Sequence, residues 1–160
     1  MSNNSQIFVS YSHDDEFFAH SLIDALKGKL IERDFRSSVV WMDTQQIFAG
    51  DDWVDKVEKA IKDSFVVLLV VSPAAMKSFN VNYEWAFAFG AGKVVIPIIY
   101  KDPGELPAKL RHRIQIKFKD DSLKLLGSLQ WRELLDAVEK TYNDSNGSKS
   151  IQVSSILRQT

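Results

Sequence analysis

A single carboxylate among aromatic side chains is the first feature of this sequence suited to chemistry. From residue 81 to residue 92 the only charged side chain is Glu84, and its neighbours include Tyr83, Trp85 and Phe87. A carboxylate that is buried without compensation costs several kcal/mol, or its pKa rises until it is protonated. We therefore interpret Glu84 as a candidate functional acid, with a solvent-facing position on the rim of a helix as the alternative.

The residues around Glu84 predict a strand, a crossover helix and a second strand. Aliphatic runs at residues 66–71 and 94–99 flank the segment 72–92, which we interpret as the helix. Pro97 lies inside the second run and has no N–H to donate to a sheet, which argues against regular pairing along that whole strand.

The rest of the chain continues this alternation of strands and helices. Strands are predicted at residues 7–9, 39–43, 65–71, 94–100 and 114–118. Helices are predicted by apolar side chains at helical spacing, at residues 18–30, 54–61 after an N-cap at Asp51, 72–92 and 125–142. This order predicts an α/β fold, a flavodoxin-like three-layer sandwich in which a five-stranded parallel sheet carries helices on both faces.

Polar residues follow the two strands that are expected to border a binding crevice. Parallel sheets bind ligands at the carboxyl ends of their strands, where the strand order reverses, and in the flavodoxin-like order this point lies between the first and third strands. Ser10, Tyr11 and Ser12 end the first strand, and Ser72 ends the third. The segment with Glu84 leaves from the same rim. Helix capping is the alternative role for Ser10 and Ser12.

Composition narrows the class of protein. The chain has 160 residues, 45% of them hydrophobic and 26% charged, as expected for one folded, water-soluble domain. Its net charge of -1 gives no reason to expect nucleic acid or an acidic membrane as a partner. The N-terminal residues resemble no secretion signal, and no apolar run has membrane-spanning length, so a cytoplasmic location is expected.

The sequence lacks the residues that several common kinds of functional site require. The absence of cysteine excludes disulfides and thiolate chemistry, and the three histidines have no metal-ligand spacing, so no metal site is expected. A phosphate-accepting receiver domain needs an aspartate at the end of the third strand, where this chain has Ser72 and Pro73. No G-x-G-x-x-G follows the first strand, and Gly90 and Gly92 predict a helix C-terminus with a glycine at positive φ.

Taken together, these motifs resemble those of a Toll/interleukin-1 receptor (TIR) domain of the bacterial type over residues 5–142. The resemblance rests on Ile-Phe-Val-Ser-Tyr-Ser at residues 7–12 together with Asp14 and Asp15, and on Val-Trp-Met-Asp at 40–43 followed by the segment 47–53. It also rests on Ser72 and Pro73 ahead of Glu84. Residues 1–142 are therefore expected to form the domain, and 143–160 a linker to a second domain of a longer protein, with a flexible native tail as the alternative.

The resemblance implies a reaction and a site. Catalytic TIR domains cleave NAD⁺ at the bond between nicotinamide and ribose, so NAD⁺ is the expected substrate and no separate cofactor is needed. Glu84 corresponds to the catalytic glutamate of the family. The positions that match the family's nucleotide pocket are Ser10, Tyr11, Asp43, Ile47, Gly50 and Trp53. The alternative for Asp43 is a turn-closing role, and for Trp53 it is packing alone.

One position departs from the family pattern. Many NAD⁺-cleaving members carry an aromatic residue four positions before the glutamate, and this chain has Asn80 there. Tyr83 is the candidate replacement for that stacking surface and is included among the expected substrate-binding residues. Trp85 falls on a helical stripe with Val81 and Ala88 and is interpreted as core.

Three functions compete at this point. The leading hypothesis is an NAD⁺ glycohydrolase or cyclase that acts as a bacterial anti-phage effector or produces a signal. The second is a non-enzymatic adaptor that works through TIR–TIR contacts around Ile47 and Phe48. The third is a nucleotide-binding or transferase domain of similar architecture. The resemblance further implies self-association, activity that depends on assembly, and a C-terminal sensor domain as a possible partner.

Overall fold

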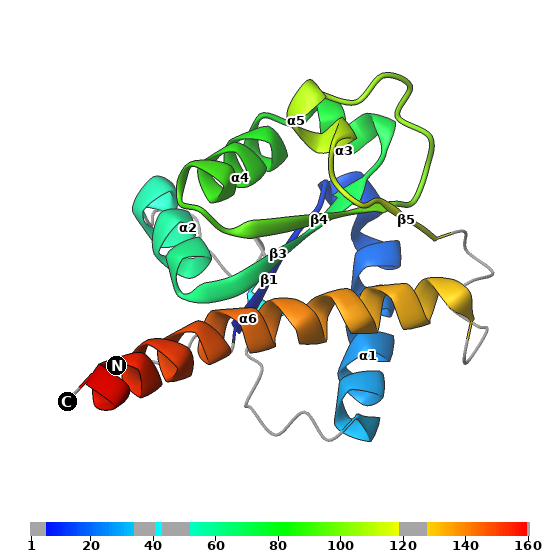
Figure 1. Ribbon diagram of the computed structural model, residues 1–160. Helices are drawn as coiled ribbons and strands as arrows, with labels where there is room; N and C mark the ends of the chain where they lie inside the picture. The colour runs from blue at the N-terminus through cyan, green and yellow to red at the C-terminus, as the bar shows by residue number, and fades with distance from the viewer. Residues whose placement is uncertain (1–5, 34–40, 43–51, 119–127, 160) are drawn as a thin grey trace.

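A parallel sheet forms the centre of the protein, with the strand order β2-β1-β3-β4-β5 (Figure 1). The computed structural model describes residues 6–33, 41–42, 52–118 and 128–159. The five strands are β1 (Gln6–Ser10), β2 (Trp41–Met42), β3 (Ser64–Val71), β4 (Val94–Ile99) and β5 (Ile116–Lys117). The expected flavodoxin-like order and parallel pairing are confirmed. The edge strands β2 and β5 have only two residues each, so three long strands make up most of the sheet.

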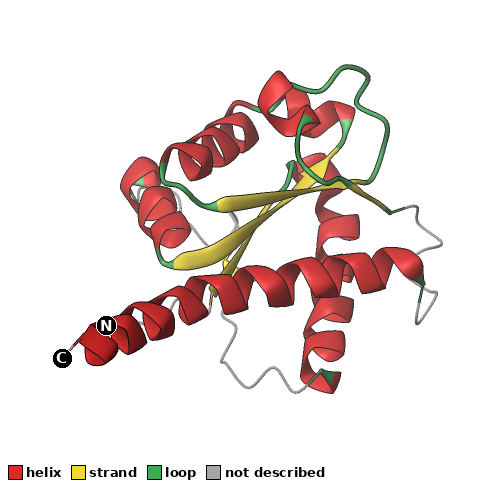
Figure 2. Ribbon diagram, viewed as in Figure 1, coloured by secondary structure: helices red, strands yellow, loops and turns green. Residues whose placement is uncertain are grey.

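Helices cover both faces of the sheet, as Figure 2 shows. One face carries α1 (Glu16–Glu32), which follows the short helix η1 (His13–Asp15), and α6 (Leu129–Gln159). The other carries α2 (Trp53–Lys62), α3 (Pro73–Lys77), α4 (Phe79–Gly90) and α5 (Ala108–Arg111). All eight residues of β3 are buried, with Val66 and Leu68 facing the first layer and alternating with Val67 and Leu69 on the second. The three-layer prediction is therefore confirmed.

The predicted single helix over 72–92 is wrong, because the segment forms two helices that meet at Ser78. The backbone of Ser78 is extended, with φ -79° and ψ 124°. Its hydroxyl accepts a hydrogen bond from the N–H of Val81 at 3.3 Å and so caps α4. At the far end of α4, Gly92 has φ 73° and the Lys93 N–H bonds to the Ala88 carbonyl, which confirms the expected glycine at positive φ.

Pro97 fits into β4 without breaking the sheet. It pairs in register with Leu69 of β3, and the register continues unshifted from Val94 to Ile99. The Ile99 carbonyl accepts from the Phe118 N–H at 2.9 Å, so Ile99 faces the β5 side of the strand. Pro97, two residues earlier, faces the same side, and no bond to β3 is lost. The expected irregularity at Pro97 is therefore absent from this pairing.

Two helix ends differ from their predictions. The helix α2 is capped by Asp52, whose Oδ1 accepts from the Asp55 N–H at 3.5 Å, whereas the predicted cap Asp51 lies outside the described residues. The final helix does not end near Tyr142, since α6 runs from Leu129 to Gln159. Each added residue of an established helix gains a hydrogen bond, and no proline interrupts this stretch. The division into a domain and a linking segment stays a prediction.

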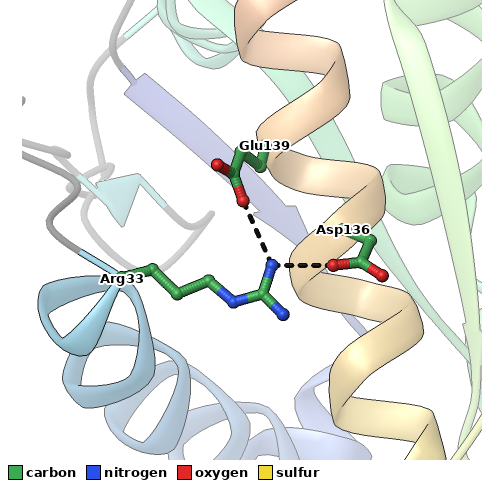
Figure 3. A network of polar contacts seen from close by, with 3 residues as sticks. All are labelled: Arg33, Asp136 and Glu139. Carbon is green, nitrogen blue, oxygen red and sulfur yellow. Dashed lines mark hydrogen bonds and ion pairs between the residues drawn. The ribbon is translucent and has the colours of Figure 1, made fainter.

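An ion-pair network ties the two helices of the first layer together (Figure 3). Arg33, just past the end of α1, donates from Nη1 to Asp136 Oδ1 at 2.7 Å and to Glu139 Oε2 at 3.1 Å, both on α6. These hydrogen bonds, that to Asp136 foremost, raise the pKa of Arg33 despite its partial burial.

Across the described ranges, no helix has both the length and the apolar composition that a membrane span needs.

Candidate functional site

Buried polar side chains gather where β1 and β3 end. Ser10, Asp15, Ser72 and Glu84 are each at most 4% exposed, although they come from β1, η1, the start of α3 and α4. The parallel pairing of β1 with β3 brings the strand ends to one edge of the sheet, with Ser10 beside Leu69. We call these four residues the strand-end cluster.

Glu84 and Ser10 form the first contact of the strand-end cluster. Glu84 lies on α4 with no exposed surface, so the solvent-facing alternative is wrong. Ser10 lies two residues beyond Phe8 on the face of the sheet that α4 covers, because side chains alternate along a strand. Its hydroxyl donates to Glu84 Oε1 at 3.4 Å. A buried carboxylate held in this way can accept hydrogen bonds from ligand hydroxyls and stabilise positive charge that develops beside it.

The second contact, between Asp15 and Ser72, was not foreseen. The Ser72 hydroxyl donates a short hydrogen bond to Asp15 Oδ2 and accepts one from the Ala75 N–H at 3.0 Å. One hydroxyl thus caps α3 and satisfies a carboxylate that is 4% exposed. In the sequence, Asp15 is singled out only as one of the two aspartates that carry the family resemblance. The available signal was its position shortly after β1, next to the end of β3 where Ser72 lies.

Tyr11 and Ser12 do not join Glu84. Tyr11 follows Ser10 and points to the opposite face of the sheet, where its ring is buried against α1 and its hydroxyl lies 3.1 Å from His20 Nε2. The Ser12 hydroxyl accepts from the Asp14 N–H at 3.3 Å, which is the capping role given above as its alternative.

Tyr83 and Trp53 meet on a different side of α4. Tyr83 turns toward α2, where its hydroxyl donates to Glu58 Oε1 at 2.7 Å and its ring centroid lies 5.5 Å from that of Trp53. The hydrogen bond to Glu58, followed by desolvation and the charge of Glu58, raises the pKa of Tyr83. Adjacent residues of a helix point about 100° apart, so Tyr83 is held by α2 and not by Glu84. Trp53 is half-buried against the core, in line with its packing alternative.

The remaining residues singled out from the sequence lie either outside the described residues or elsewhere on α4. Asp43, Ile47 and Gly50 lie outside the described residues. Trp85 packs against the second core cluster and donates from Nε1 to Asn82 Oδ1 at 2.8 Å, which confirms its interpretation as core. Asn80 is exposed at the start of α4. Among the described residues, no group of acids and histidines is arranged to hold a metal ion.

Comparison with known proteins agrees with this fold. The structure is similar to the crystal structure of the TIR domain of the Toll-related receptor TRR-2 from Hydra magnipapillata, with a TM-score of 0.62 and 21% identity over 83% of this chain and 97% of that one. It also matches a flavodoxin-like domain from Synechococcus with a TM-score of 0.48 and 15% identity, over 90% of this chain and 98% of that one. No protein of curated function matches the sequence. The profile of the TIR domain family matches residues 7–130, and the chain therefore belongs to the TIR domain family.

Proposed function

We propose that this TIR domain cleaves NAD⁺ at the bond between nicotinamide and ribose, with Glu84 as the catalytic carboxylate. The observation that carries the proposal is the complete burial of Glu84 at the carboxyl ends of β1 and β3, with Ser10 donating to it. The family includes NAD⁺-cleaving members, and we assign Glu84 to the position of their catalytic glutamate.

The chemistry needs only one acidic residue. Nicotinamide leaves NAD⁺ as a neutral molecule, so no general acid has to protonate the leaving group, in contrast to ordinary glycosidases with two carboxyl groups. The Glu84 carboxylate accepts hydrogen bonds from the ribose hydroxyls and stabilises the positive charge that develops on the ribose as the bond breaks. Ser10 holds Oε1 so that the carboxylate keeps one orientation through the reaction.

The rest of the binding site is also a proposal. The Ser10 hydroxyl contacts Glu84. The polar groups of Tyr11, Ser12 and Tyr83 instead contact His20, the Asp14 N–H and Glu58. For Tyr11 and Ser12 we therefore propose contacts through the backbone at the end of β1. The other proposed substrate contacts are Asp43, Ile47, Gly50 and the ring surface of Trp53 and Tyr83.

The proposal extends to how the protein assembles and to its biological role. TIR domains self-associate through contacts with one another, and we propose that such contacts complete the site and control its activity. The proposed setting is the cytoplasm of a bacterium, where NAD⁺ cleavage acts in defence against phage or produces a signal. A C-terminal sensor domain is the proposed source of the trigger.

The test is nicotinamide release from NAD⁺ at high protein concentration. We expect release by the wild type and a loss of about 100-fold or more in Glu84→Gln, which keeps the size of the side chain but removes its charge. Glu105→Gln is the matched control, because the Glu105 side chain is 84% exposed and pairs with Arg111 at the surface. Circular dichroism and thermal unfolding verify that both variants fold.

Two results would contradict the proposal. Equal release by the wild type and Glu84→Gln would remove Glu84 from the reaction. No release by the wild type, even when it is concentrated and assembled, would favour the adaptor role. Chromatography of the products separates ADP-ribose from cyclic forms and so distinguishes hydrolysis from cyclisation.

A further inference from the structure

A cavity lies on the face of the sheet opposite Glu84, between the last turn of α1 and the first turns of α6. Its volume is about 260 Å³, and its lining includes Lys29 and Arg33 from the α1 side and Ser128, Trp131 and Arg132 from the α6 side. Glu84 lies on α4, in the layer that covers the other face. The cavity is thus separate from the proposed catalytic site.

Lys29 is the unusual residue of this cavity. It is only 9% exposed, whereas lysine is rarely buried without an ionic partner. Its ammonium nitrogen lies over the ring of Trp131, 5.0 Å from the centroid. In the part of the chain that the structure describes, no carboxylate pairs with it. A cation–π contact compensates part of the lost hydration and leaves the N–H donors of the ammonium group available.

Two arginines add positive charge to the same cavity. Arg132 is exposed, and no acidic partner binds it within the described ranges. Arg33 uses Nη1 for both Asp136 and Glu139, so its other guanidinium nitrogens retain donors (Figure 3). The lining contains one acid, Glu32. Asp136 and Glu139 already offset the charge of Arg33. The lining then holds two further cations, Lys29 and Arg132, against one carboxylate.

The start of α6 also favours an anion in this cavity. The Ser128 hydroxyl accepts from the Trp131 N–H at 3.4 Å, and the Ser128 carbonyl accepts from the Arg132 N–H at 3.1 Å. The first N–H groups of a helix and its dipole favour an anion at this end. Lys29 supports an anion site independently of this helix end, because it is a mostly buried cation on α1 that lines the same cavity.

We propose that this cavity binds a small phosphate-bearing anion. Ammonium and guanidinium donors beside a helix N-terminus suit the several oxygens and the double negative charge of a phosphate monoester or diphosphate. Such a ligand neutralises Lys29 and Arg132 together and bridges the two helices that Arg33 already connects. Binding here is independent of NAD⁺ cleavage.

The experiment is calorimetric titration of the full 160-residue chain, in phosphate-free buffer at ionic strength fixed with NaCl. The probes are pyrophosphate, ribose 5-phosphate and glycerol 3-phosphate, which represent inorganic, nucleotide-derived and lipid-derived sources of the same group. We expect saturable binding of at least one probe with a Kd below about 1 mM, and a rise in Tm with that probe. The strongest probe identifies the source.

Variants at the cavity make the assignment specific. Lys29→Met keeps the length of the side chain and removes its charge, and Arg132→Gln alters an exposed position that tolerates change. Each is expected to weaken binding at least tenfold. Glu32→Gln removes the one acid and is expected to strengthen binding, an effect that a purely structural role does not produce. Lys109→Met, an exposed lysine on α5, is the matched control and is expected to leave binding unchanged.

The proposal is overturned if none of the three probes gives saturable heat. It is also overturned if the cavity variants and Lys109→Met bind equally well, since the anion would then bind elsewhere on the protein. If Lys29→Met does not fold, Arg132→Gln and Glu32→Gln still decide the outcome, because their expected effects have opposite signs.

Discussion

The protein uses acidic side chains in two contrasting ways. In the strand-end cluster, Asp15 and Glu84 are buried and accept hydrogen bonds from serine hydroxyls. On α6, Asp136 and Glu139 have side chains that are 63% and 45% exposed, and both bind the guanidinium of Arg33. The first arrangement satisfies buried carboxyl groups with neutral donors, whereas the second pairs opposite charges in contact with water.

The difference shows where polar groups matter most for the fold. Water solvates an exposed carboxylate whether or not its partner is present, so an exposed ion pair contributes about 0–1 kcal/mol. A buried carboxylate that loses a donor keeps the full cost of its desolvation. The strand-end cluster is therefore expected to be sensitive to single hydroxyl groups, and the α1–α6 network to be tolerant.

The largest effect on stability is expected for Ser72→Ala. This change removes the cap of α3 and also the hydroxyl that donates to buried Asp15, so we expect a loss of about 3 kcal/mol of unfolding free energy. Ser78→Ala is the matched control, because Ser78 caps α4 through Val81 and is expected to cost about 1 kcal/mol. Urea unfolding measures both. Equal losses for the two variants would show that the Asp15 contact adds nothing.

The strand-end cluster also shows what sequence reasoning can and cannot locate. Parallel pairing predicted that Ser10 and Glu84 share one edge of the sheet, and their hydrogen bond confirms it. The contact between Asp15 and Ser72 depends on the path of a loop, which side-chain periodicity does not describe. Tyr11 is a different case, since strand alternation already places it on the face opposite Ser10.

Similar limits apply to the fold. The alternation of aliphatic strands with amphipathic helices was enough for the three layers, because these are set by which surfaces must be buried. The strand order was taken from the flavodoxin-like arrangement, since alternation alone also fits other doubly wound orders. The break at Ser78 was missed because one serine either caps a helix or lies within it, depending on the local backbone. The length of α6 was missed because a polar run with Gly147 has the composition of a linker, yet the helix continues to Gln159.

A smaller effect is expected at the exposed network. Arg33→Gln removes the charge shared by Asp136 and Glu139, and we expect a loss of about 0.5 kcal/mol that disappears at 1 M NaCl, because salt screens exposed charges. Urea unfolding in phosphate-free buffer measures it without a ligand in the neighbouring cavity. The loss in Ser72→Ala is expected to persist at high salt. A salt-independent loss above 2 kcal/mol in Arg33→Gln would place this network with the buried interactions.

The smallest effect at neutral pH concerns Tyr83 and Glu58, a half-buried pair between these two extremes. The hydrogen bond to Glu58, with desolvation and the charge of Glu58, raises the pKa of Tyr83 and so favours the neutral phenol in the folded state. This contribution to stability is fully present below the pKa of tyrosine in the unfolded chain, about 10, and is lost as pH rises through the higher pKa of the folded state. Ultraviolet titration of tyrosinate is expected to show a late step that is absent in Tyr83→Phe. Glu58→Gln is expected to move that step to lower pH, and an unchanged step would assign the raised pKa of Tyr83 to burial instead.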